Sequence, residues 1–151
     1  MHRHRTGVLM VLLAVLLSFS AATISATPSA HGVVWGKVPG FPNEPDIQLT
    51  FNVKDTGPDL EDDRGTVSGR LFDPETGKLA AVLVSTRVFN VGVEPDGLIY
   101  FAATLRLVTG TFPTPQRTIQ FTAHDGGAID QFWVGQFEVE IKRATIVARI
   151  P

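Results

Sequence analysis

Hydrophobic and polar side chains alternate at every second position along much of the chain. The alternation is clearest at residues 46–54, 99–107 and 118–123. A period of two is typical of a β-strand with one buried face. Weaker runs of the same β-branched character lie at residues 31–35, 66–72, 79–93 and 145–150. We therefore expect about eight or nine strands and no amphipathic helix.

Short turns rich in glycine, proline and aspartate separate these runs. Residues 73–77 (DPETG) and 94–97 (EPDG) each combine a proline suited to the first corner with a glycine suited to a positive φ. Strands joined by such turns pair as antiparallel neighbours. One apolar face per strand requires two packed sheets or one closed sheet. The sequence thus predicts an all-β, single-domain antiparallel β-sandwich or meander β-barrel, and leaves both open.

Residues 117–141 form the strongest hairpin pattern. Its first strand is 118–123, and the sequence HDGG at 124–127 predicts a polar tip. The apolar phase of the return strand slips at Gly135 and Gln136. Such a slip predicts a β-bulge within one continuous strand.

The front of the chain has a different composition. Residues 1–5 are basic, residues 8–17 are almost all apolar, and small residues follow. This order is typical of a secretory signal peptide, so we expect removal of residues 1–26, with cleavage after Ala22 or Ala26. An uncleaved membrane anchor is the alternative. The interpretation predicts a secreted or extracytoplasmic β domain at 31–151, with no membrane partner after cleavage.

Charge and cysteine content exclude several functions. The chain has 13 basic residues, 15 acidic residues and no cysteine. Without Arg3 and Arg5 the balance is modestly negative, which disfavours nucleic acid and anionic membranes as partners. The lack of cysteine excludes disulfides, thiol catalysis and cysteine-ligated zinc. Core packing alone must therefore hold the domain together.

The hairpin tip at 124–130 (HDGGAID) is the candidate for metal or acid–base chemistry. Asp125 and Asp130 flank two glycines, and oxygen-rich turns of this kind bind calcium. Ordinary hairpin turns use the same residues, and this is the alternative. His124 beside Asp125 has the residue types of a general base and its orienting carboxylate. Neighbours at a strand end point in different directions, so we assign no catalytic residue.

Three aromatic side chains are candidates for ligand binding. Trp133 and Tyr100 fall on the outward phase of their strands, and the phase of Trp35 is undecided. Exposed aromatic rings stack on sugars and other flat ligands. Burial against a crossing loop is the alternative. Five phenylalanines fit the inward phase and are expected in the core: Phe51, Phe101, Phe121, Phe132 and Phe137.

The sequence TIQFTAHDGGAIDQFWV at 118–134 resembles the closing hairpin of a family of uncharacterised secreted bacterial all-β domains. In that family, a strand of the type T-V-T-V-T-D leads into an N-G-x-P-G turn, followed by D-x-F. The matching residues are Phe121, Asp125, Gly126, Asp130 and Phe132. The proline of the turn is absent, and Ala128 and Ile129 lie near its place. The resemblance implies an all-β fold but no particular activity.

Three functions remain open at this point. The first is a non-catalytic extracellular binding or accessory module for a polysaccharide or a protein. The second is a lipocalin-like barrel that binds an apolar small molecule, for which the alanines and glycines of the inward faces leave room. The third is a small barrel enzyme, an isomerase or hydrolase, that uses His124, Asp125 and Asp130. A surface aromatic patch would favour the first, an apolar cavity the second, and inward polar residues the third.

Overall fold

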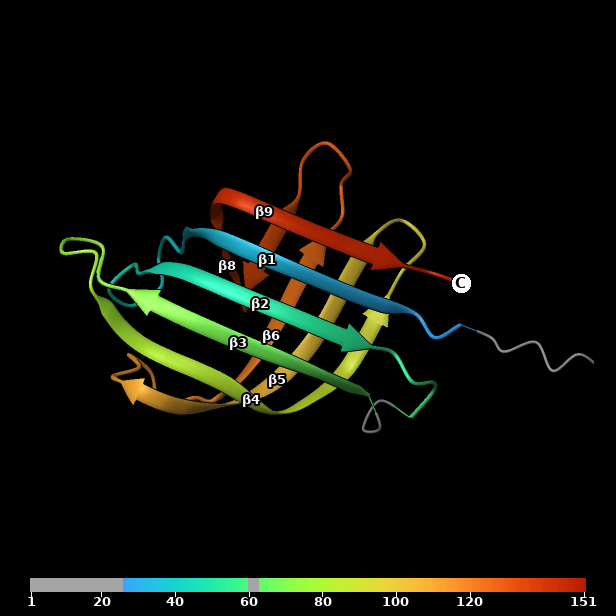
Figure 1. Cartoon of the computed structure of the whole chain (residues 1–151), viewed down its shortest axis with the longest axis horizontal. Coiled ribbons are helices and arrows are strands. Elements are labelled where there is room, and N and C mark those ends of the chain that lie inside the picture. The colour runs from blue at the N-terminus through green and yellow to red at the C-terminus, as the bar shows by residue number, and fades with distance from the viewer. Residues whose placement is uncertain (1–25, 60–62) are drawn as a thin grey trace, which may run out of the picture.

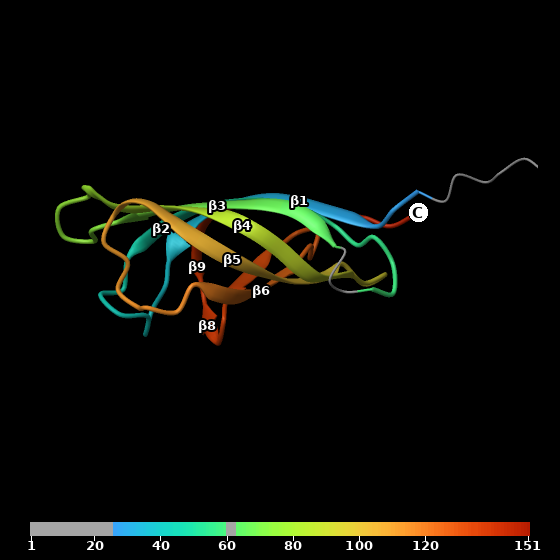
Figure 2. The same ribbon diagram turned by 90° about the horizontal axis from the view of Figure 1, so that it is seen from below.

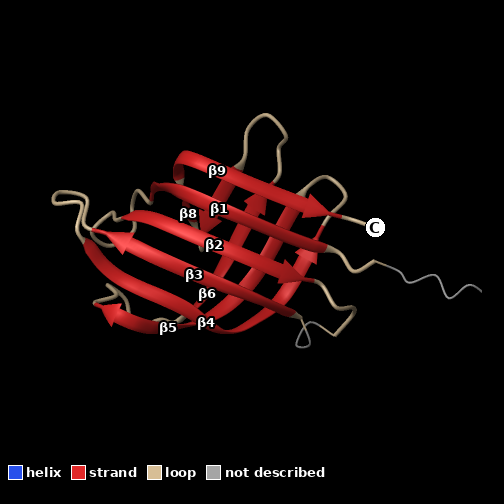
Figure 3. Cartoon of the chain, in the orientation of Figure 1, coloured by secondary structure: helices blue, strands red, loops and turns tan. Residues whose placement is uncertain are grey.

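The computed structural model describes residues 26–59 and 63–151, which form nine β-strands and no helix. The strands are β1 (Ser29–Lys37), β2 (Asp46–Lys54), β3 (Arg64–Phe72), β4 (Leu79–Val93), β5 (Leu98–Gly110), β6 (Thr118–His124), β7 (Gln131–Val134), β8 (Phe137–Glu138) and β9 (Glu140–Arg149). They make one antiparallel sheet in the order β8-β7-β6-β5-β4-β3-β2-β1-β9 (Figure 1, Figure 3). The all-β prediction is therefore confirmed.

The sheet curls until its two edges approach each other. The strands β1, β2 and β3 form one wall, and β5 and β6 cross behind them in the opposite wall (Figure 1, Figure 2). The strands β8 and β9 follow each other in the chain, yet β8 pairs with β7 and β9 pairs with β1. Val139, between them, donates its N–H to the carbonyl of Phe132 at 2.9 Å. The result is a nearly closed barrel rather than a two-sheet sandwich.

The long strand β4 turns the sheet from one wall to the other. Its register with β5 shifts at three places, the last between Phe89 and Gly92. Bulges of this kind bend a strand and increase its twist. The buried carboxylate of Asp63 supports this last bulge, because it accepts the N–H of Val91 at 2.6 Å and that of Thr56 at 3.0 Å. Such a buried carboxylate needs these donors to offset its desolvation.

The predicted bulge at Gly135 and Gln136 is wrong. These two residues form a tight turn, and Val134 pairs with Phe137 across it. Gly135 has a φ of 60°, which glycine adopts without steric cost and which a two-residue hairpin turn requires. The predicted single return strand is therefore divided into β7, β8 and β9, and the last strand begins before residue 145.

The two ends of the barrel have different loops. We call the end with loops 38–45, 73–78 and 111–117 the cavity end, and the end with turns 94–97 and 125–130 the closed end. Toward the closed end the interior is filled by four phenylalanine rings, each at most 1% exposed, with neighbouring centroids 5.1–6.1 Å apart. These rings, which we call the phenylalanine core, are Phe51, Phe101, Phe121 and Phe132. The fifth predicted core ring, Phe137, is only half-buried.

Candidate functional site

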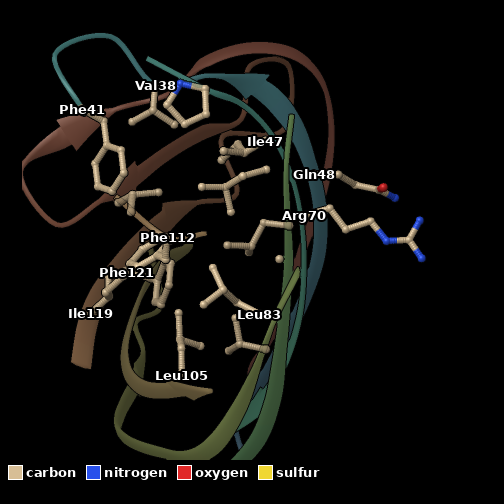
Figure 4. A pocket seen from close by; sticks show the side chains of 16 residues that line it. Val38, Phe41, Ile47, Gln48, Arg70, Leu83, Leu105, Phe112, Ile119 and Phe121 are labelled. Carbon is tan, nitrogen blue, oxygen red and sulfur yellow. The ribbon is translucent and has the colours of Figure 1, made fainter. Parts of the chain in front are cut away.

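The cavity end contains an apolar cavity of about 50 Å³. Its wall is formed by inward side chains of β2 to β6, including Leu49, Leu71, Leu83, Leu105 and Ile119. The only polar side chains among its bordering residues are those of Gln48 and Arg70, and both point to the outside of the sheet (Figure 4). The space inside is therefore bounded by hydrocarbon.

The cavity exists because one inward position has no side chain. Gly69 lies on β3 between the buried residues Val67 and Leu71, and it pairs with Leu49 on β2 and with Leu83 on β4. A Cβ atom added at Gly69 would meet nothing within 4 Å. The alternation of hydrophobic and polar residues does not by itself predict this site. Its signal was a glycine at an inward position in the interior of a strand.

Three half-buried aromatic rings cover the cavity end, and we call them the aromatic lid: Phe41, Phe112 and Phe137. The ring of Phe41 packs 6.1 Å from that of Phe112 and edge-on at 5.6 Å from that of Phe137. The guanidinium of Arg117 lies 5.0 Å from the centroid of Phe112, within the range of a cation–π contact. Phe41 and Phe112 are carried by loops rather than by strands.

The carboxylate of Glu44 adds side-chain contacts to the backbone hydrogen bonds of the loop that carries Phe41. Glu44 accepts the N–H of Gly40 at 3.2 Å and forms an ion pair with Lys37 at 3.3 Å. The Gly40 N–H and then the Lys37 ammonium hold the pKa of the Glu44 carboxyl below its usual value of 4.5. Glu44 has a φ of 38°, a conformation that non-glycine residues rarely adopt. The ionised side chain thus helps to keep an unusual backbone conformation.

The two candidate metal ligands bind backbone groups of the edge strand β9. Asp125 accepts the N–H of Ala148 at 3.1 Å, and Asp130 accepts that of Ile146 at 3.2 Å. Within residues 26–59 and 63–151 no group of three or more His, Asp or Glu side chains is arranged to hold a metal ion. The calcium site stays a prediction, and both carboxylates have a structural role on the open edge of β9.

His124 and Asp125 have different partners. The Nε2 atom of His124 lies 3.1 Å from the carbonyl oxygen of Asp96. The carboxylate of Asp125 accepts N–H groups from Gly127 and Ala148. The arrangement fixes the turn at 125–130 against the turn at 94–97, and it does not form the general-base pair that the sequence order suggests.

Two of the three candidate aromatic residues lie in one row on the outside of the barrel. Trp133 pairs with Thr122, which pairs with Tyr100 on the next strand, and both aromatic side chains are half-buried. Partial burial, followed by the nearby charge and hydrogen bond of Glu94, raises the pKa of Tyr100 above 10.0. Trp35 lies on β1 in the other wall, stacked on Phe72 at 6.2 Å.

Comparisons with protein-family models, with curated proteins and with solved structures find no match to this chain. The part of the chain that the structure describes has no helix of the length and apolar character needed to span a membrane. The predicted signal peptide falls almost wholly on residues 1–25, which are outside the described residues. The function must therefore be inferred from the geometry of the barrel itself.

Proposed function

We propose that this protein is a secreted, non-catalytic binding protein that holds a small apolar molecule at the cavity end of its barrel. The observation that carries the proposal is the apolar cavity at Gly69 beneath the aromatic lid. Apolar cavities of this kind exclude water and accept apolar ligands. The secreted location comes from the signal-peptide pattern at the front of the chain.

The size of the cavity indicates how a ligand would bind. Its volume of about 50 Å³ is roughly a third of the volume of about 150 Å³ in which a protein cavity holds benzene. A ligand must therefore displace part of the aromatic lid. Phe41 and Phe112 are suited to such movement, because loops carry them and both rings are half-buried. Displacing either ring would make room for a ring or a short hydrocarbon chain.

Binding is favoured over catalysis by the chemistry of the wall. No residue that lines the cavity points an acid, a base or a nucleophile into it. The candidate catalytic pair, His124 and Asp125, lies in the closed end and is engaged with backbone groups. A ligand in the cavity would therefore be held by apolar contact and released unchanged.

The test is to fill the cavity from Gly69. The series Gly69→Ala, Gly69→Val and Gly69→Leu adds side chains of increasing size to an empty space. Binding is measured with the neutral fluorescent dye N-phenylnaphthylamine, and folding by thermal unfolding. We expect dye affinity to fall stepwise, by about tenfold or more at leucine, while the melting temperature is kept or raised.

The matched control is Ser68→Val, which adds an apolar side chain at the neighbouring exposed position of β3. This variant is expected to bind the dye like the parent protein. If the parent protein does not bind the dye, or if a folded Gly69→Leu variant binds it equally well, the proposed function is wrong.

A second candidate function is supported by the outer row of Trp133, Thr122 and Tyr100. The backbones of its two aromatic residues are two strand spacings apart, about 10 Å, and a hydroxyl group lies between them. Aromatic rings that flank a polar group are suited to a polysaccharide chain. Titration with soluble glucans should quench the fluorescence of Trp133, and Trp133→Phe should remove that response. Trp35→Phe, in the opposite wall, is the control, and this variant should still show the quenching.

A further inference from the structure

The barrel wall is incomplete beside the aromatic lid. β6 begins at Thr118, but β7 pairs only with its residues from Phe121 to His124. Residues 118–120 therefore have β5 on one side and no paired strand on the other. The carbonyl of Thr118 accepts the side-chain amide of Gln116 at 3.1 Å, and that of Gln120 accepts the N–H of Gly135 at 2.8 Å. A turn and a side chain thus replace a strand at this point.

A surface groove follows this opening and reaches the cavity wall. Its volume is about 210 Å³, and residues of loop 111–117, of β6 and of the turn after β7 line it. Three of its residues, Phe41, Ile119 and Val134, also line the cavity. The groove and the cavity are therefore separated by shared side chains, one of which belongs to the aromatic lid.

The groove is mainly apolar, with four polar side chains along it and no charged one. Its polar members are the hydroxyl groups of Thr114 and Thr118 and the amides of Gln116 and Gln120. Within the described residues, the side-chain amide of Gln120 has no hydrogen-bond partner. The nearby cation Arg117 is turned toward Phe112 and donates to the carbonyl of Thr114 at 2.9 Å. The groove thus presents hydrogen-bonding groups without a neutralising charge.

From this arrangement we propose that the ligand is an uncharged amphiphile that enters through the opening beside residues 118–120. Its hydrocarbon part occupies the cavity, and a head group with hydroxyl groups lies in the groove against Gln120. A carboxylate or ammonium head would lose hydration there without gaining an opposite charge. The inference rests on the proposed function, because it identifies the class of ligand for the same cavity.

The first experiment compares three ligands, each with an unbranched ten-carbon chain, as competitors of the bound dye. They are glycerol monodecanoate, decanoate and decyltrimethylammonium. We expect the glyceride to displace the dye at a concentration about tenfold lower than either ion, a difference of roughly 1.4 kcal/mol. Preference for decanoate would overturn the inference and indicate that Arg117 recognises the head group.

The second experiment removes the free amide of the groove. Gln120→Met keeps the length of this exposed side chain and should remove most of the preference for the glyceride over the two ions. Thr122→Val is the control, since Thr122 is the next outward residue of β6 but does not line the groove. If Gln120→Met leaves the preference intact, the head group does not lie in the groove and the inference is wrong.

These outcomes separate the inference from the proposed function. If the parent protein binds the dye but does not distinguish the three ten-carbon compounds, the cavity remains a binding site and the inference of an uncharged amphiphile is wrong. If the parent protein does not bind the dye, both the proposed function and the inference are wrong. Thermal unfolding of each variant shows whether a lost response reflects loss of the fold.

Discussion

The two ends of the barrel each contain an inward glycine, and only one of them leaves a cavity. Gly32 on β1 pairs directly with Phe51, whose ring lies so close that an added Cβ would be 2.6 Å from its Cε1 atom. Gly69 on β3 pairs with Leu49 and Leu83, and the space above it is empty. An inward glycine therefore produces a cavity only where no large neighbour folds over it, and strand register decides which case applies.

The walls of the two ends differ in a related way. At the closed end, the carboxylates of Asp125 and Asp130 reach across to N–H groups of β9 and connect the two edges of the sheet. At the cavity end, residues 118–120 lack a strand partner on one side, and the groove lies there. The closed end is thus linked across its edges, and the cavity end has the opening through which the proposed ligand would enter.

The largest expected effect is the loss of stability when a ring is truncated, which should be greater in the phenylalanine core than in the aromatic lid. Phe101 is 1% exposed and packs against Phe51 at 5.2 Å and against Phe121 at 5.1 Å. We expect Phe101→Ala to lower the free energy of unfolding by about 3–5 kcal/mol. Phe112→Ala in the lid should cost only about 1 kcal/mol, since its ring is half-buried. Chemical denaturation measures both, and equal losses would contradict the comparison.

The next expected effect is on the free energy of unfolding, which a Gly→Ala substitution should lower at Gly32 and raise at Gly69. Gly32→Ala forces the Phe51 ring to move and should lower the free energy of unfolding by about 1–3 kcal/mol. Gly69→Ala meets open space and should raise it by about 0.4–1 kcal/mol, because alanine restricts the unfolded chain. Both variants are measured by the same denaturation experiment. Destabilisation by Gly69→Ala would show that the space at β3 is not available to a side chain.

The sequence predicted the inward faces of the strands better than their arrangement in space. The bounds of β2 agree with the predicted run at 46–54, and four of the five expected core phenylalanines are fully buried. Alternation identifies which side chains point inward, but it does not determine how far a sheet curls. The pattern therefore left sandwich and barrel equally open.

The functional features were harder to predict because they depend on residues distant in the chain. The partners of Asp125 and Asp130 are backbone groups 23 and 16 residues further on. The cavity depends on the register that sets Gly69 between two leucines instead of beside a phenylalanine. The sequence at Gly135 predicts a bulge where the structure has a turn, because both features interrupt the alternation of a strand in the same way.

A smaller effect is expected at the connection between the edges of the closed end. Asp125→Ala and Asp130→Ala each remove a carboxylate that accepts an N–H of β9, and each should cost about 1 kcal/mol. Hydrogen exchange resolves the contact directly: the amides of Ala148 and Ile146 should exchange faster in the respective variants. Val147 lies between them in the sequence, and its N–H points toward β1. Its exchange rate should not change, so it serves as the internal control. Unchanged exchange would show that the edges are held by other contacts.

The same variants test the calcium prediction. A ligand that binds only the native state raises the melting temperature. If calcium raises it and the double variant Asp125→Ala, Asp130→Ala abolishes the rise, the tip is a metal site. If neither calcium nor a chelator changes the melting temperature, the two carboxylates serve only the connection to β9.

The smallest expected effect concerns the aromatic lid: the rate of dye association should depend on pH. The pKa of Glu44 is lowered below 4.5, chiefly by the N–H of Gly40 and then by Lys37. A lowered folded-state pKa means that the contribution of Glu44 is complete above its unfolded value and is lost as the pH falls through the folded value. Protonation should therefore loosen loop 38–45 and accelerate dye association, which stopped-flow fluorescence measures. The Glu44→Gln variant should bind the dye rapidly at every pH.

A matched control for this effect is Asp73, at the same end of the barrel. Its pKa is also lowered, chiefly by the N–H of Thr76, but its carboxylate accepts bonds only within its own turn, from Glu75 and Thr76. Asp73→Asn should therefore leave the pH dependence of dye association unchanged. If Asp73→Asn removes the acceleration and Glu44→Gln does not, access to the cavity is governed by turn 73–78 rather than by the loop that carries Phe41.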